Sequence, residues 1–178
     1  MNTLIISFSL RQNSNSLKVA EHLKTKTGGK ILDLQEINLS MWGIKTDVWN
    51  QIKPRLEQAD SYIFVIPEYC GSPSPSYFNF CMFLGSEVAH KPVLLVSVSS
   101  GRGGSYPIIG ARAFGYKNSK INYIPEHLIF RNVEEEDYKT GFMDQKTDYI
   151  LGIFAIYETN FVQIRKQIVL NPSFANGM

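Results

Sequence analysis

The chain has 178 residues, of which 18 are Lys or Arg and 16 are Asp or Glu, so its formal net charge is +2. This length predicts a single domain over residues 1–178, because domains average roughly 150 residues. The near balance of charge argues against a nucleic-acid-binding protein, which needs a basic excess, and a hydrophobic content of 44% argues against a disordered chain.

Short apolar runs alternate with helical patterns along the chain. Strands are predicted at residues 3–7, 31–34, 61–66 and 93–98, and a fifth at 121–124 and 128–130 with an interruption at Pro125. The third and fourth runs are almost continuously apolar, and Pro67 and Pro92 bound them. Continuous apolar runs of this length are typical of parallel strands that helices cover on both faces.

Helical periodicity fills the intervals between the apolar runs. The predicted helices carry apolar stripes at Leu17, Ala20 and Leu23, at Val48, Ile52, Leu56 and Ala59, and over residues 77–84, 108–114 and 147–167. Pro54 predicts a kink or a late start in the second of them, and Asn171-Pro172 is expected to close the last. Fivefold strand–helix alternation predicts a doubly wound α/β fold with a five-stranded parallel sheet in the flavodoxin-like order 2-1-3-4-5.

The helix over residues 77–84 is apolar on nearly all sides, so it must be buried on all sides. One face is expected to meet the sheet. We expect another face, involving Phe78 or Phe83, to meet a second subunit across a two-fold axis. The alternative is that the chain's own C-terminal segment covers this helix.

Ligands of such sheets bind outside the carboxyl ends of the strands, which directs attention to three loops. The loop after the first strand, residues 7–16, contains four serines, two asparagines and Arg11 and runs into a helix. Serine hydroxyls, a guanidinium and a helix N-terminus favour a phosphate. The loop has no glycine, which excludes a Walker A loop and a dinucleotide fingerprint. The alternative is a loop that only caps its helix.

The two other loops have backbones suited to close approach by a ligand. Residues 67–76 include three prolines, a glycine and Tyr69, which offers an aromatic face. Residues 99–105 include three glycines. Each loop alone is equally consistent with an ordinary connection, but three such loops at one sheet edge indicate a binding site.

The motifs of these loops resemble those of the NAD(P)H-dependent FMN reductase family. I-S-F-S-L-R-Q-N-S-N-S is similar to its phosphate loop I-S-G-S-L-R-x-x-S-x-[NS], P-E-Y-C-G-S-P to its P-E-Y-N-G-S-x-P, and S-S-G-R-G-G to its S-x-G-x-x-G-G. Their order and spacing also match. The resemblance implies a flavodoxin-like protein with bound FMN that takes hydride from NAD(P)H and passes two electrons to a small acceptor, such as a flavin, a quinone, an azo compound or a metal oxyanion.

The resemblance also implies the residues of the site and the assembly, a homodimer or homotetramer. Phosphate binding would fall to Ser9, Arg11, Ser14, Asn15 and Ser16; one border of the isoalloxazine to Pro67, Glu68, Tyr69, Cys70 and Gly71; and the other edge to Ser99, Gly101, Gly103 and Gly104. No catalytic side chain is expected, because the flavin carries the chemistry.

Four positions depart from the family's motifs. Phe8 and Cys70 stand where the family has Gly and Asn, Phe78 where it commonly has Lys, and Ser105 where the third motif ends in Gly. Two alternatives stay open. The first is a flavodoxin-type electron carrier, and the second, which Phe8, Cys70 and Phe78 motivate, is a non-catalytic binding protein with a weakened flavin site. The charge of +2 and the absence of a T/S-x-T-G-x-T loop disfavour the first.

Other site classes find little support in the sequence. Cys70 and Cys81 have no metal-ligand spacing, and His22, His90 and His127 are scattered, so we expect no metal site and no hydrolase. No apolar stretch reaches the roughly 20 residues that span a bilayer, and the N-terminus lacks a basic signal-peptide region. We expect a soluble, cytoplasmic protein that binds neither membrane nor nucleic acid.

Overall fold

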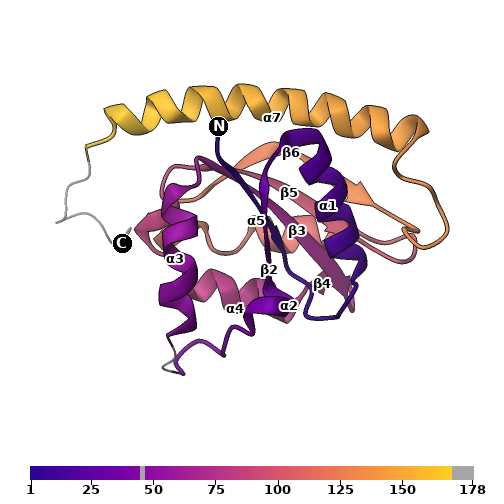
Figure 1. The fold of residues 1–178 in the computed structure, drawn as a ribbon, viewed down its shortest axis with the longest axis horizontal. Coiled ribbons are helices and arrows are strands. Elements are labelled where there is room, and N and C mark those ends of the chain that lie inside the picture. Colours follow the sequence, from indigo (N-terminus) through magenta and orange to yellow (C-terminus); the bar gives the residue numbers. More distant parts are fainter. Residues whose placement is uncertain (45–46, 170–178) are drawn as a thin grey trace.

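The computed structural model describes residues 1–44 and 47–169, and its centre is a twisted sheet (Figure 1). The strands are β1 (Thr3–Ser7), β2 (Lys30–Asp33), β3 (Ser61–Tyr69), β4 (Ser72–Pro73), β5 (Pro92–Val98) and β6 (Asn122–Phe130). The main sheet has the order β2-β1-β3-β5-β6, and all its neighbouring strands are parallel. This is the predicted order once the hairpin strand β4 is set aside, so the predicted fold class is confirmed.

Helices cover both faces of the sheet. They are α1 (Asn15–Thr27), α2 (Leu34–Ile37), α3 (Val48–Gln58), α4 (Pro75–Phe83), the 3₁₀ turn η1 (Ser86–Val88), α5 (Ser105–Arg112), α6 (Tyr116–Ser119) and α7 (Gly141–Gln167). α1 and α7 pack on one face, and α3, α4 and α5 on the other. The predicted helix end at Asn171-Pro172 lies outside the described residues.

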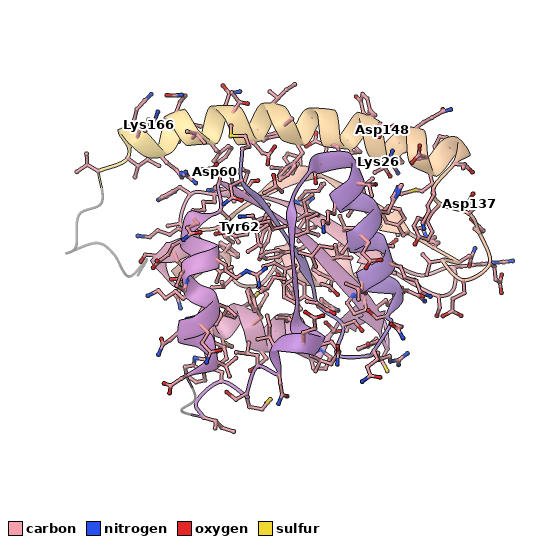
Figure 2. The ribbon with its side chains drawn as sticks, in the orientation of Figure 1. Lys26, Asp60, Tyr62, Asp137, Asp148 and Lys166 are labelled. Atoms are coloured by element: carbon pink, nitrogen blue, oxygen red, sulfur yellow. The ribbon has the colours of Figure 1, made fainter. Side chains whose placement is uncertain are left out.

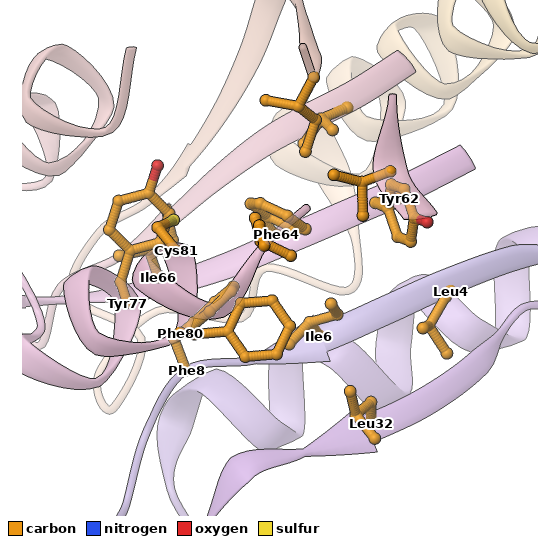
Figure 3. Close-up of a cluster of buried hydrophobic side chains, with 14 of the residues drawn as sticks. Leu4, Ile6, Phe8, Leu32, Tyr62, Phe64, Ile66, Tyr77, Phe80 and Cys81 are labelled. Atoms are coloured by element: carbon orange, nitrogen blue, oxygen red, sulfur yellow. The ribbon is translucent and has the colours of Figure 1, made fainter. Parts of the chain in front are cut away.

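Burial on both faces explains why the central strands read as continuous apolar runs. Every residue of β1 and β5 is buried, as are residues 61–67 of β3. Successive side chains of a strand point to opposite faces, so the same strands supply two hydrophobic cores. Figure 3 shows the core under α3, α4 and α5, where aromatic side chains meet the aliphatic residues of β1 and β3.

β6 is one continuous strand, although Pro125 predicted an interruption. The register between β5 and β6 shifts between Val93 and Leu95, so Pro125 lies in a bulge of an edge strand, where its missing N–H costs no ladder bond. The Arg112 guanidinium donates hydrogen bonds to the carbonyls of Ile124 and Pro125 at 2.7 and 2.6 Å. An arginine from α5 therefore stabilises the irregular segment.

Two helices also differ from their predicted form. α7 begins at Gly141, six residues before the predicted start at 147. The sequence pattern does not reveal this first part of the helix, because residues 141–146 carry little apolar periodicity and Thr140 makes no side-chain cap bond. α4 is partly covered by its own chain: Phe83 stacks on Trp49 at 5.1 Å between ring centroids, and Phe78 meets Phe114 at 5.1 Å. α7 lies on the opposite face of the sheet.

Candidate functional site

A polar cavity of about 330 Å³ lies at the carboxyl edge of the sheet. It brings together the loop after β1, the first turn of α1, the end of β3 and the residues that follow β5. The predicted residues that line it are Ser9, Arg11, Ser14, Asn15, Ser16, Pro67, Glu68 and Tyr69. The loop after β1 and the start of the P-E-Y motif thus face one shared space.

Phe8 fixes the start of this loop in the hydrophobic core. Its ring is fully buried and packs edge-on against Phe64, Tyr77 and Phe80 at 5.1 to 5.3 Å between centroids (Figure 3). Its carbonyl accepts hydrogen bonds from the hydroxyls of Ser74, at 3.1 Å, and Ser76. The phenyl group that replaces the family's glycine therefore points away from the cavity, and the loop after β1 is tied to the start of α4.

The first turn of α1 faces the cavity with hydrogen-bond donors. Ser14 caps the helix, because its Oγ accepts the N–H of Leu17 at 3.1 Å. A helix leaves its first N–H groups without intrahelical partners, and its N-terminus carries partial positive charge. The Oγ of Ser16 is buried and has no hydrogen-bond partner among the described residues. The helix start thus presents donors and an unsatisfied hydroxyl to an anion.

Four charged side chains line the cavity, two of each sign. The Arg11 guanidinium lies over the Tyr69 ring, 5.1 Å from its centroid, and Lys18 lies on α1. Glu134 accepts a hydrogen bond from the Asn15 side-chain amide at 2.8 Å. Glu68 accepts a hydrogen bond from the Gly104 N–H, in the loop after β5.

The predicted glycines of the third loop hold that loop against β3. The Glu68 carboxylate accepts the Gly104 N–H at 2.6 Å. A Cβ on Gly103 would lie 2.0 Å from the same carboxylate, and Gly104 has φ of +99° with Ile129 in close contact. Gly104 therefore requires glycine, whereas a side chain at Gly103 would force the Glu68 carboxylate to move. The residues that line the cavity include none of Ser99, Gly101, Gly103 and Gly104.

Cys70 and Gly71 form the turn between β3 and β4. Both have positive φ, +52° and +69°, as a two-residue type I′ hairpin turn requires. Asparagine adopts this conformation readily, which gives a backbone reason for the family's Asn at position 70. The Cys70 side chain is exposed and lines a second, apolar cavity of about 710 Å³ with Trp42, Phe78 and Met82 among others.

The sequence did not single out some residues that line the polar cavity, namely Gln12, Asn13, Lys18, Val98, Ser100 and Glu134. Gln12 and Asn13 belong to the predicted loop, and Val98 and Ser100 flank the predicted Ser99. Glu134 gave no such signal, because its loop reaches the site through tertiary contact: the Asn132 N–H donates to the Gly101 carbonyl at 3.0 Å.

The geometry also bears on other classes of site. Within residues 1–44 and 47–169, no three His, Cys, Asp or Glu side chains cluster as metal ligands would. None of the helices over the same residues combines the length and apolar character that crossing a bilayer requires.

Known proteins share both the sequence pattern and the fold of this chain. The family model for NADPH-dependent FMN reductase matches residues 1–135. An NADPH azoreductase of Bacillus sp. (strain OY1-2) is 22% identical over 79% of this chain and 83% of its own length. An oxidoreductase from Corynebacterium diphtheriae superimposes with a TM-score of 0.69 at 14% identity, covering 90% of this chain and 96% of that one.

The general stress protein 14 of Treponema denticola, solved in complex with FMN, superimposes with a TM-score of 0.55 at 14% identity, covering 90% of this chain and 99% of that one. At such identities the structures support the fold, and the family model, which spans more than half of the chain, establishes the family. The chain therefore belongs to the NADPH-dependent FMN reductase family and is an oxidoreductase whose cofactors are FMN and NAD(P)H.

Proposed function

We propose that the polar cavity receives the FMN phosphate, that the segments around Glu68 and Gly104 border the flavin ring, and that the enzyme passes electrons from NAD(P)H to a small acceptor. When bound, FMN supplies the chemistry, accepting hydride from the nicotinamide and giving up two electrons. The acceptors we propose are a flavin, a quinone, an azo compound or a metal oxyanion, as in the family that the motifs resemble.

The observation that carries this proposal is the donor set at the start of α1. The hydroxyl of Ser16 is buried without a partner among the described residues, beside a helix N-terminus and within a cavity that Arg11 also lines. A buried hydroxyl without a partner is costly, and a phosphate oxygen would satisfy it. The residues present thus fit a phosphate monoester.

The remaining residues of the site bind, orient and exclude water. The Arg11 guanidinium, which lies over the Tyr69 ring, also lines the cavity. It would donate strong charge-assisted hydrogen bonds to the phosphate oxygens. The hydrogen bond from Gly104 N–H to Glu68 fixes the spacing between the two loops that would border the ring. Pro67 and Val98 give the cavity an apolar wall. No step assigned to the protein requires a side chain to gain or lose a proton.

Flavin titration of the purified protein tests the proposal. The wild type should retain FMN through desalting, and NADPH or NADH should bleach the flavin absorbance without air, which also identifies the preferred donor. Arg11→Ala should weaken FMN binding about tenfold, the effect of losing a charge-assisted hydrogen bond. Arg55→Ala, at an exposed arginine of α3 outside the cavity lining, is the matched control and should bind FMN normally.

Two outcomes would contradict the proposal. If no FMN binds at all, the phosphate site is wrong and a non-catalytic binding protein becomes the better description. If FMN binds equally to wild type and Arg11→Ala, the cofactor occupies another surface. Where FMN binds as proposed, the turnover rate with one acceptor of each class ranks the four classes of acceptor.

We further propose that the protein forms a homodimer or homotetramer in the cytoplasm. Met41, Trp42 and Met82 are exposed by 68, 56 and 46% and form an apolar surface beside α4, which a second copy would cover. Met82→Glu should lower the mass in solution, and an unchanged mass would remove this surface from the assembly.

The exposed thiol of Cys70 suits a reducing compartment.

A further inference from the structure

A groove of about 390 Å³ lies at the opposite end of α1 from the polar cavity. Its walls are one side of α7, the last turn of α1 and the start of β1, where the N-terminus lies beside α7 (Figure 1). We call it the α7 groove. α1 begins at the polar cavity with Asn15 and reaches the α7 groove with Thr27, so the length of the helix, about 18 Å, separates the two sites.

The α7 wall of the groove is a stripe with acidic residues at its ends and apolar or small residues between them. Its members follow one another at intervals of three or four positions, which places them on one side of the helix: Asp148, Leu151, Gly152, Ala155 and Glu158. The stripe is about 15 Å long. No described atom lies within 4 Å of the position that a Cβ would take on Gly152, so the groove is open at its middle.

Glu158, at one end of the stripe, is a buried carboxylate without a counter-charge. Its side chain belongs to a residue exposed by 7%, and its Oε1 accepts the hydroxyls of Thr3, at 2.6 Å, and Ser61. Within the described residues, Oε2 accepts no hydrogen bond and the carboxylate forms no ion pair. Buried charges in proteins are normally paired, so this carboxylate lacks a cation on the side of the groove.

The other end of the stripe also carries excess negative charge. The Lys26 ammonium lies 2.8 Å from Asp144 and 2.6 Å from Asp148, so one ammonium serves two carboxylates. His22 lies 3.4 Å from Asp144, but burial lowers its pKa from 6.5, so it is neutral at pH 7. The Asp148 side chain is 60% exposed and can accept a further donor. Figure 2 shows Lys26 and Asp148 close together below α7.

The walls between the two ends suit the body of an aliphatic cation. Leu151, Phe154 and Ala155 give the α7 groove apolar surface. Thr27 is the last residue of α1, and the final carbonyls of a helix carry partial negative charge. A metal ion is not favoured, because no three His, Cys, Asp or Glu side chains of residues 1–44 and 47–169 form a cluster.

We propose that the α7 groove binds a linear aliphatic polyamine. One ammonium group donates to Oε2 of Glu158, a second donates to Asp148, and the methylene chain lies along Leu151, Gly152 and Ala155. Hydrogen bonds from an ammonium to a carboxylate are charge-assisted and strong, and methylene groups gain free energy by leaving water. The inference does not depend on the flavin chemistry.

Calorimetric titration of the full chain with spermidine tests the proposal. Butylamine, which has a single ammonium, should bind about tenfold more weakly than spermidine, the effect of losing one charge-assisted hydrogen bond. Glu158→Gln keeps the shape of the side chain without its charge and should weaken spermidine binding about tenfold. Glu57→Gln, at a half-exposed glutamate of α3 outside the groove, removes the same charge and is the matched control.

Asp148→Asn locates the second ammonium of the ligand. This variant should weaken spermidine binding about tenfold. It should leave butylamine binding unchanged, because the single ammonium of butylamine occupies Glu158. An equal loss for the two amines would contradict the placement of a second ammonium at Asp148.

Gly152→Leu separates loss of the ligand from loss of the fold. The leucine side chain would fill the middle of the groove, and leucine favours a helix interior over glycine. The variant should therefore lose spermidine binding while its thermal midpoint without ligand is at least that of the wild type. Spermidine should raise the midpoint of the wild type and of Glu57→Gln but not that of Gly152→Leu, because a ligand stabilises the folded state that binds it.

Three outcomes would overturn the proposal. The first is no saturable binding of spermidine to the wild type. The second is equal affinity of Glu158→Gln and Glu57→Gln, which would show that spermidine acts only as a diffuse counter-ion. The third is unchanged spermidine binding by Gly152→Leu. FMN retention by the same variants should equal that of the wild type, so failure of this proposal and failure of the proposed flavin site give different results.

Discussion

At the scale of single residues, Cys70 adopts an unfavourable backbone conformation, and its exposed side chain makes no hydrogen bond within the described structure that would offset the free-energy cost. It occupies the first central position of the β3–β4 turn with φ of +52°. Residues other than glycine, asparagine and aspartate adopt this conformation at a cost of about 1 kcal/mol. The departure from the family's asparagine therefore lowers the stability of the hairpin.

Cys70→Asn should raise the free energy of unfolding by about 0.5–1 kcal/mol, because asparagine tolerates positive φ. Urea denaturation with the same slope for both proteins measures it. Cys70→Ala removes the thiol but keeps the conformational cost, so its midpoint should stay near that of the wild type. A gain from alanine equal to that from asparagine would show that the thiol, and not the backbone, is the cause.

Lys91 lowers the stability of the folded chain in a different way, through the burial of a charged ammonium group. Its ammonium is buried and donates to the carbonyls of Leu56 and Glu57, at 2.8 and 2.9 Å, at the end of α3. Burial, aided by the positive charge of Arg165, lowers the pKa of Lys91 from 10.5 to about 8. Between these two pH values the unfolded chain binds more protons than the folded one, so stability rises as pH rises through this window.

We expect the free energy of unfolding of the wild type to rise relative to that of Lys91→Met by roughly 2–3 kcal/mol between pH 8 and 10.5. The comparison with methionine, which keeps most of the volume, removes the titration of other groups. Lys53→Met, at a half-exposed lysine of α3, should show no such divergence. Parallel stability curves for wild type and Lys91→Met would mean that Lys91 keeps its proton throughout.

At the scale of elements, the third loop makes one close contact with β3, beside hydrogen bonds from Arg131 to the Gly103 carbonyl and from the Asn132 N–H to the Gly101 carbonyl. A Cβ on Gly103 would come 2.0 Å from the Glu68 carboxylate, which also accepts the Gly104 N–H. Gly103→Ala should therefore displace the Glu68 carboxylate from the Gly104 N–H and weaken FMN binding about tenfold, measured by calorimetric titration. Gly152→Ala on α7 is the matched control, since Gly152 does not line the cavity and no described atom lies within 4 Å of its Cβ position. Equal FMN affinity for the two variants would contradict this role of the contact.

The elements that sequence predicts well are those whose burial is uniform. β1, β3 and β5 are buried on both faces, so their apolar runs identify them without ambiguity. The hairpin strand β4 has two residues and a Cys70-Gly71 turn without the usual Asn-Gly signal. The start of α7 is mostly exposed, so periodicity cannot reveal it. Local pattern fails where tertiary contact decides the conformation.

At the scale of the whole molecule, the candidate site also contains residues that local sequence pattern predicts and residues that only tertiary contact brings in. The loops after β1 and β3 could be predicted because parallel strands deliver their carboxyl ends to one edge. Glu134 could not, because the acidic segment after β6 reaches the cavity only through its contact with the loop after β5. Sequence therefore predicts the donors that we propose for phosphate binding better than the negatively charged Glu134 beside them.

Phe8 links the first loop to the centre of the protein, since its ring is enclosed by Phe64, Tyr77 and Phe80. The start of this loop cannot leave its place unless the aromatic cluster opens, and opening the cluster disrupts the hydrophobic core on this face of the sheet. The release of flavin on heating should therefore report the unfolding of the hydrophobic core. On heating, flavin should escape at the same temperature at which helical circular dichroism collapses, with no range in which a colourless yet folded protein accumulates.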